Sequence, residues 1–250
     1  MLPFIIIAIT LFLGAWSLPV IKDPSVDQSL IQMSQTWSLP HLMNMLSTLA
    51  IIGVAVYGLL KQPRFRLGWQ VLLGLITFVI ALILSGATAI YYQWTPHTLS
   101  LLIQRIPIAL GLLGGVAFVL LSAQLTFQTW VALALYFILQ ACAVACVLYT
   151  YFMDDFSFYI MAHIFPLTVL LVSNIRLKEQ NRSRHLLYCL GFYICAQICS
   201  AYSDLTYQYT YDYIHGYTLR HILIALGSYY FLQFFIYLKP VELTDMNEPT

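Results

Sequence analysis

The chain has 250 residues, of which 61% are hydrophobic, 15% aromatic and only 8% charged. A soluble domain carries roughly a quarter charged residues, so this composition, with a mean hydropathy of +0.82, predicts an integral membrane protein. The net charge is +1 and no block of basic residues occurs, which argues against a nucleic-acid partner.

Eight apolar segments follow one another along the chain, at about 3–20, 41–60, 69–92, 106–124, 129–152, 156–175, 186–205 and 218–238. Spanning helices need about 20 residues, so we predict an all-α polytopic membrane protein of about eight spans. We expect a single transmembrane domain over residues 1–250, with a first helix at 1–20, a seven-helix core at 41–238 and a cytoplasmic tail at 239–250. The first segment lacks a basic start and an Ala-x-Ala-like cleavage site, so we interpret it as a retained helix.

Basic residues in two short loops predict the orientation of the spans. The loops carry Lys61, Arg64 and Arg66, and Arg176, Lys178, Arg182 and Arg184. Cytoplasmic loops of membrane proteins are enriched in Lys and Arg, so both loops, and with them both termini, should be cytoplasmic. The loop at 93–105, the pair Asp154-Asp155 and the stretch Asp204–His221 then face the outside.

The stretch Asp204–His221 gathers two Asp, two His and one Arg among tyrosines, directly before the last apolar segment. Ionisable side chains are costly to bury at a membrane helix, so they mark a candidate site. Asn44 and Ser47 share a face of the second apolar segment, three residues apart, also near the outer face. These two side chains could hydrogen-bond a neighbouring helix, or they could belong with the stretch Asp204–His221 to an outward-facing polar cavity.

Short motifs in a fixed order resemble one known family. They are Lys22-Asp23-Pro24, Leu39-Pro40 with Asn44 and Ser47, Tyr91-Tyr92 with Pro96, Arg105-Ile106-Pro107, Asp154-Asp155, Tyr159 with Pro166, and Gly216–His221. Between about Leu18 and about Leu232 the chain resembles the bacterial branch of the alkaline ceramidase-like membrane hydrolases. The resemblance implies a seven-helix bundle in which three His hold zinc, while a Ser and an Asp assist the metal-activated water that attacks an amide.

The positions that correspond to this implied site have mostly changed. Where the family has Ser, His, Asp and the first His of a final pair, this chain has Ala89, Gln93, Gln104 and Tyr217; only His221 remains. Zinc sites normally use at least three protein ligands, so we expect no cofactor and assign no catalytic residue. Three of the substituted side chains can still form hydrogen bonds.

We therefore predict a catalytically inactive, ceramidase-like protein, in a bacterial inner membrane by resemblance, that binds a membrane lipid, a lipid-like ligand or a protein partner. The candidate cavity residues are Asn44, Ser47, Gln93, Gln104, Asp204, His215, Tyr217 and His221. We also expect Asp204 to pair with Arg220 or Arg105.

Two alternatives stay open. A zinc-dependent amide hydrolase would need a rewired site, built from His41, His97, His215 and His221. A small-solute or ion transporter would relay ions through Asp204 and Asp212, although the interiors of the spans contain almost no ionisable residues. The metal content of the purified protein would separate the hydrolase from the binding protein.

Overall fold

The computed structural model describes residues 39–61, 68–125, 127–176, 180–211 and 213–236, with isolated positions between 6 and 21. Within these residues the structure is helical and contains no strand. The helices are α3 (Leu39–Lys61), α4 (Trp69–Trp94), α5 (Thr98–Leu110), the π-helical turn η2 (Gly111–Ala117), α6 (Phe118–Gln124), α7 (Thr129–Met153), α8 (Ser157–Arg176), α9 (Gln180–Ala201), α10 (Ser203–Tyr209) and α11 (Gly216–Ile236). Most of the expected first helix at 1–20, and the whole tail at 239–250, lie outside the described residues.

Six helices in the described part of the chain are long and apolar enough to cross a membrane. The segments α5, η2 and α6 together form one of them, Thr98–Gln124. If α9 and α10, which bend by 80° at their junction, form one span, they make a seventh. The prediction of an all-α polytopic membrane protein is thus confirmed. The remaining span of the expected eight is the first one, at residues 3–20, and it lies largely outside the described residues.

The expected loop at 93–105 is wrong, because α4 continues to Trp94 and α5 already begins at Thr98. His97 caps α5: its Nδ1 accepts a hydrogen bond from Ser100 N at 2.9 Å, and His97 N donates to Ser100 Oγ at 3.1 Å. Such reciprocal bonds satisfy two donors at a helix start. Gln104 and Arg105 therefore lie on a helix, and both are buried.

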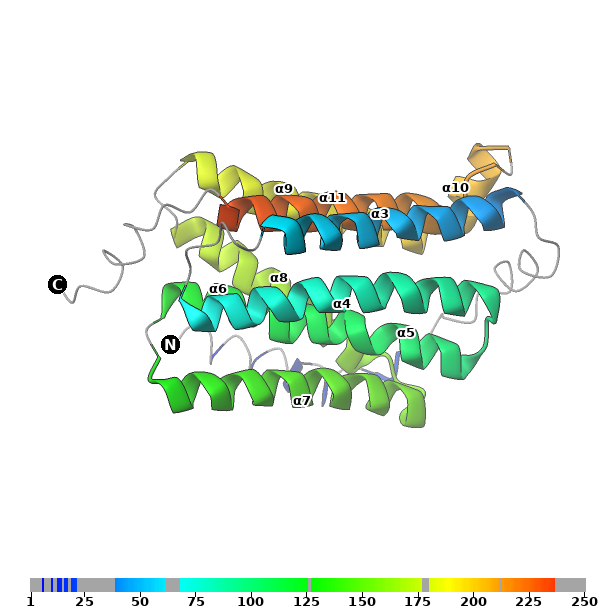
Figure 1. Ribbon diagram of the computed structural model, residues 1–250. Helices are drawn as coiled ribbons and strands as arrows, with labels where there is room; N and C mark the ends of the chain where they lie inside the picture. Colours follow the sequence, from blue (N-terminus) through cyan, green and yellow to red (C-terminus); the bar gives the residue numbers. More distant parts are fainter. Residues whose placement is uncertain are drawn as a thin grey trace.

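The helices form one bundle, in which α3 and α11 lie side by side, α7 lies on the opposite side, and α10 caps the end where α3 begins (Figure 1). α11 also packs closely against α9. Successive helices alternate in direction, so Lys61, Arg176 and Arg184 lie at the same end, which we call the basic end. This agrees with the expectation that the two basic loops share one side of the membrane.

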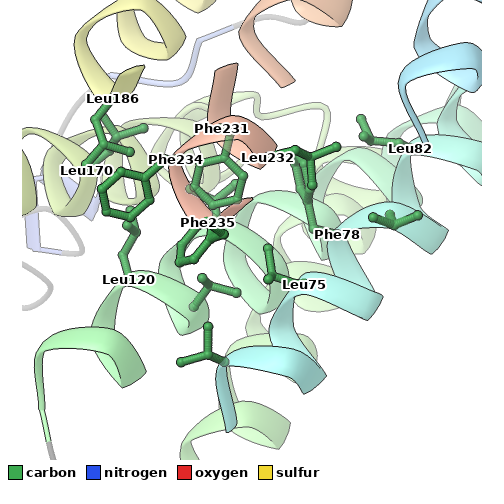
Figure 2. Close-up of a cluster of buried hydrophobic side chains, with 14 of the residues drawn as sticks. Leu75, Phe78, Leu82, Leu120, Leu170, Leu186, Phe231, Leu232, Phe234 and Phe235 are labelled. Carbon is green, nitrogen blue, oxygen red and sulfur yellow. The ribbon is translucent and has the colours of Figure 1, made fainter. Parts of the chain in front are cut away.

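The basic end is filled by a hydrophobic core. Figure 2 shows its side chains converging from α4, α6, α8, α9 and α11. Phe78 of α4 and Phe231 of α11 meet edge to face, with ring centroids 4.9 Å apart. A Cβ on Gly115 of η2 would lie 2.8 Å from Phe78 Cβ, so this glycine permits the close helix contact. The tightly packed basic end leaves the opposite end as the place for a cavity.

The turn between α7 and α8 is organised by one carboxylate. Asp155 Oδ1 accepts hydrogen bonds from Ser157 N at 3.0 Å, from Ser157 Oγ at 2.6 Å and from Ile21 N at 3.4 Å. Phe156 N donates in turn to Ile21 O at 2.8 Å. Burial acts to raise the pKa of Asp155, but the bonds from Ser157 and Ile21 outweigh it and hold the pKa below its usual value. The carboxylate thus ties the start of α8 to Ile21.

Replacing Asp155 by Asn should lower stability, because the three donors then meet a neutral oxygen instead of a charged one. We expect a loss of about 1 kcal/mol at neutral pH. Since the folded-state pKa is lowered, this contribution is present above the ordinary pKa of 3.8 and is lost as the pH falls below it. Thermal unfolding in detergent should show a gap between wild type and variant that closes in acid. The matched change in the exposed Asp154, Asp154→Asn, should leave the unfolding temperature unchanged at both pH values.

α11 begins at Gly216, where the chain passes directly beside the end of α9. A Cβ at this position would lie 2.2 Å from Cys199 O and 2.6 Å from Ser203 Cα. Both are backbone atoms, which cannot turn aside as a side-chain tip does. The absence of a side chain at Gly216 therefore sets how closely α11 approaches the α9–α10 junction.

Gly216→Ala should force these backbones apart and destabilise the protein by about 1–3 kcal/mol. The control is Gly191→Ala on α9, where an added Cβ has no neighbour within 4 Å. That change should be neutral or stabilise by a few tenths of a kcal/mol up to about 1 kcal/mol, because Ala favours a helix over Gly. Thermal unfolding of both variants in detergent checks this. Equal midpoints would contradict the close-approach argument.

Candidate functional site: a polar cavity within the helix bundle

A cavity of about 810 Å³ lies at the end opposite the basic residues. Its walls come from α3, α4, α5, α8, α9, α10 and α11, and the α10 residues Ser203 and Asp204 contribute to its rim. Sites for small molecules in proteins occupy roughly 300–1,000 Å³. The cavity is therefore large enough for one small ligand or for the polar part of a larger one.

Six of the eight predicted cavity residues line this space: Asn44, Gln93, Gln104, Asp204, Tyr217 and His221. They come from five different helices and span most of the sequence. The other two predicted residues, Ser47 and His215, lie immediately behind lining residues. Ser47 Oγ is 2.9 Å from His221 Nδ1, and the His215 ring stacks on that of Tyr217 with centroids 5.1 Å apart. The structure thus brings the predicted set together.

The hydrogen bonds of His221 assign its tautomer. Ser47 Oγ donates its single proton to Asn44 O at 2.7 Å, so in the contact between Ser47 and His221 the donor is the Nδ1–H group. His221 Nε2 then keeps its lone pair, and the side chain lines the cavity. Ser47 does not line the cavity, so this Ser–His pair orients an imidazole and does not present a nucleophile. The ring offers a hydrogen-bond acceptor to whatever occupies the space.

Four buried polar atoms on cavity-lining residues have no hydrogen-bond partner among the described residues. They are Asn44 Oδ1, Gln93 Oε1, Tyr193 Oη and Arg220 Nε. The Asn44 and Gln93 side chains are each only 2% exposed. A buried polar group without a partner costs about 1–3 kcal/mol, so such groups normally face water or a ligand. Because these atoms lie around one space, we expect the cavity to hold water or a polar ligand group.

Sequence reasoning missed two cationic wall residues as cavity groups. Arg105 of α5 is buried, and its guanidinium carbon lies 4.8 Å from the Phe156 ring centroid and 5.1 Å from that of Tyr159. Arg220 of α11 lies over the Tyr217 ring at 5.8 Å. Aromatic faces attract a cation and fix its position. The available signal was that each is a lone basic residue beside an apolar run.

Three further polar residues line the cavity and were not among its predicted residues: His163 of α8, and Tyr193 and Gln197 of α9. His163 Nδ1 lies 2.8 Å from Tyr159 O, one turn earlier in the same helix. The carbonyl accepts this bond, which therefore stays within α8. The His163 ring also lies over Tyr159, at 4.4 Å between centroids. No sequence spacing connects these residues to the predicted set.

At the rim, Asp204 and His215 form a local pair. His215 Nε2 lies 4.0 Å from Asp204 Oδ1, and His215 Nδ1 accepts a hydrogen bond from Tyr217 N at 3.4 Å. His215 is fully buried, whereas the Asp204 side chain is 70% exposed. The expected pairing of Asp204 with Arg220 or Arg105 stays a hypothesis. His215 uses both ring nitrogens near the rim and supports the Tyr217 ring.

The four histidines of the rewired zinc site occupy different surroundings. His97 is exposed and caps α5 through its Nδ1, whereas His41, His215 and His221 are buried. Among the residues that the structure describes, no group of three or more His, Cys, Asp or Glu side chains lies close enough to hold one metal ion. The rewired site therefore gains no support from the described geometry.

A second, narrower space of about 90 Å³ adjoins the polar cavity. The two share wall residues, including Gln104, His163 and His221, and the narrow space continues among the apolar side chains of Leu82, Leu170 and Phe231. Ala89, where the resemblance implies a Ser, lines this narrow space. The walls thus change from polar to apolar from the cavity toward the basic end.

Comparison with family models, with curated proteins and with solved structures finds no match for this chain.

Proposed function

We propose that this integral membrane protein binds an amphiphile, with the polar head in the 810 Å³ cavity and a hydrocarbon chain in the adjoining narrow space. The observation that carries the proposal is the set of unpartnered buried atoms on the cavity wall, which includes Asn44 Oδ1, Gln93 Oε1 and Arg220 Nε. A polar head would supply partners for these atoms. Water alone would supply them too, but it would not account for the apolar continuation.

The order of polar and apolar walls supports an amphiphile over a soluble metabolite. A molecule that is polar throughout would leave the apolar space beside Leu82 and Phe231 without a complementary group. Burial of apolar surface is favourable by about 25 cal/mol per Å², so a chain there would add to the affinity. Membrane lipids are the most abundant amphiphiles around a spanning protein.

We further propose that the protein is a catalytically inactive relative of the ceramidase-like hydrolases. The resemblance in motif order supports the relationship, and the substitutions at Ala89, Gln93, Gln104 and Tyr217 support inactivity. With His221 as the only imidazole at the positions that the resemblance implies, and Gln104 in place of the Asp, an activated water would lack both its metal ligands and its base.

The metal content of the purified protein tests the proposal that it is catalytically inactive and lacks a zinc site. Protein purified without chelators should contain zinc well below one equivalent, and His221→Ala should not change that content. Measurement by atomic emission, with a zinc enzyme of known stoichiometry as a standard, checks this. Stoichiometric zinc that is lost on His221→Ala, together with hydrolysis of a lipid amide, would establish the rewired hydrolase instead.

Lipid binding is tested by Gln93→Met, which keeps the length of the side chain but removes the amide. In detergent-purified protein we expect mass spectrometry to detect a co-purifying amphiphile at up to one per wild-type chain, and much less in the variant. The ligand-free variant should be as stable as the ligand-free wild type or more so, since a buried unpaired oxygen costs about 1–3 kcal/mol.

The matched control is Gln233→Met. Gln233 is also buried, but its Nε2 donates to Tyr57 OH at 2.8 Å, away from the cavity wall. This variant should lose stability and keep the amphiphile, the reverse of Gln93→Met. Wild-type protein that carries no amphiphile, and whose unfolding temperature no added lipid raises, would refute the proposed function.

A further inference from the structure

We propose that the head group bound in this cavity is anionic, a carboxylate or a phosphate, and that Arg105 and Arg220 recognise it. This inference rests on the proposed function and names the chemical class of its ligand. Both guanidinium groups belong to lining residues, one on α5 and the other on α11. Charged side chains within a membrane bundle face a polar space or a partner, and two guanidinium groups on the wall of one cavity offer donors to the same anion.

The charges of the wall favour this assignment. Among the described lining residues, the side chains that carry a permanent charge are Arg105, Arg220 and Asp204. Asp204 sits at the rim with its side chain 70% exposed, where water screens it, and His215 lies beside it at 4.0 Å. The two guanidinium groups are less exposed than this carboxylate. The charges of the described lining residues therefore sum to +1 and favour an anion over a cation in this space.

The arrangement of the two guanidinium groups suits recognition as well as attraction. The rings of Phe156 and Tyr159 hold Arg105, and the ring of Tyr217 lies under Arg220, whose Nε–H has no partner among the described residues. A guanidinium group presents a planar set of donors that matches two oxygens of a carboxylate or phosphate. The aromatic contacts hold these donors in place before a ligand arrives.

The neutral polar groups are compatible with an anion. The amides of Asn44 and Gln93 can each present either an oxygen or an NH₂ group, because the two orientations are nearly indistinguishable in shape. Turned toward an anion, they would add donors to those of the arginines. His221 Nε2 would accept a hydrogen bond from a protonated oxygen of the head, such as a hydroxyl or a phosphate OH.

The adjoining apolar space limits the hydrocarbon part. Its volume of about 90 Å³ is near three times the liquid volume of one water molecule, so it admits part of one chain and not two side by side. The chemical class is therefore a single-chain anionic amphiphile. Its charge would come from a fatty-acid carboxylate or from a phosphate monoester, and free inorganic anions share the same head chemistry without the chain.

The experiment compares ligands that differ only in the head. Palmitate, palmitamide and lysophosphatidate with the same chain are titrated into the full-length protein in a non-ionic detergent, with acetate and inorganic phosphate as chain-free probes. We expect palmitate or lysophosphatidate to bind between about tenfold and about a hundredfold more tightly than palmitamide. The chain-free anions should bind far more weakly than either.

The variant Arg220→Gln should abolish most of this preference while palmitamide binds as before, and Arg105→Gln should act in the same way. Arg220→Lys keeps the charge without the planar fork and should retain an intermediate preference. The control is Arg184→Gln, an exposed arginine at the basic end, which should change neither affinity. The comparison of head groups in the wild type needs no variant, so a misfolded variant would not prevent the test.

The possible results separate the anionic head group from amphiphile binding itself. Equal binding of palmitate and palmitamide would overturn the anionic head but leave amphiphile binding intact. Failure of every chain-bearing ligand to bind would overturn both proposals. Chain-free anions that bind as tightly as palmitate would support the arginine site and overturn the amphiphile. Loss of stability without loss of preference in Arg220→Gln would make that arginine a structural residue only.

Discussion

The arrangement of this molecule depends on how a membrane bundle treats polar groups that water cannot reach. Within hydrocarbon each such group must find a partner inside the protein, or it carries a large energetic cost. Some polar side chains of the bundle have such partners: Gln233 donates to Tyr57, and Thr77 Oγ1 lies 2.8 Å from Tyr136 OH. Single buried oxygens such as Gln124 Oε1 and Gln140 Oε1 have none among the described residues. At the cavity, by contrast, several unpartnered atoms, among them Gln93 Oε1, lie around one space that a ligand can enter.

The scaffold creates this space through breaks in its helices. The junction of α9 and α10 bends by 80°, so α10 turns across the bundle and brings Asp204 to the rim. In the span Thr98–Gln124, Pro107 cannot donate to the preceding turn, and the π-helical turn at 111–117 follows directly. Pro107 and Gly111 both line the narrow apolar space. Irregular backbone thus occurs where the bundle departs from close packing.

The sequence predicts the spanning helices well and the cavity residues only in part, because the two leave different patterns in it. Apolar runs of about 20 residues identify spanning helices almost without regard to context, and basic residues between them reveal which ends lie together. Asn44, Gln93, Gln104, Tyr217 and His221 were grouped through motif order, and they do meet.

The convergence of Arg105, His163, Tyr193 and Gln197 depends on how three helices, α5, α8 and α9, are rotated about their own axes, which a single sequence does not specify. The start of α5 was missed for a similar reason. His97 acts as a helix cap only through its bonds with Ser100, and histidine is not among the residues that usually indicate one.

The charges around His221 suit an anion better than a zinc ion. A divalent cation at its Nε2 would share the cavity with Arg105 and with Arg220, the preceding residue in the chain, while Asp204 lies at the solvated rim. Both guanidinium groups would repel such an ion through a medium that screens poorly. The same two charges attract an anion. His221, held in place by Ser47, would then accept a hydrogen bond from a protonated oxygen of the ligand, while the two guanidinium groups meet its negative charge.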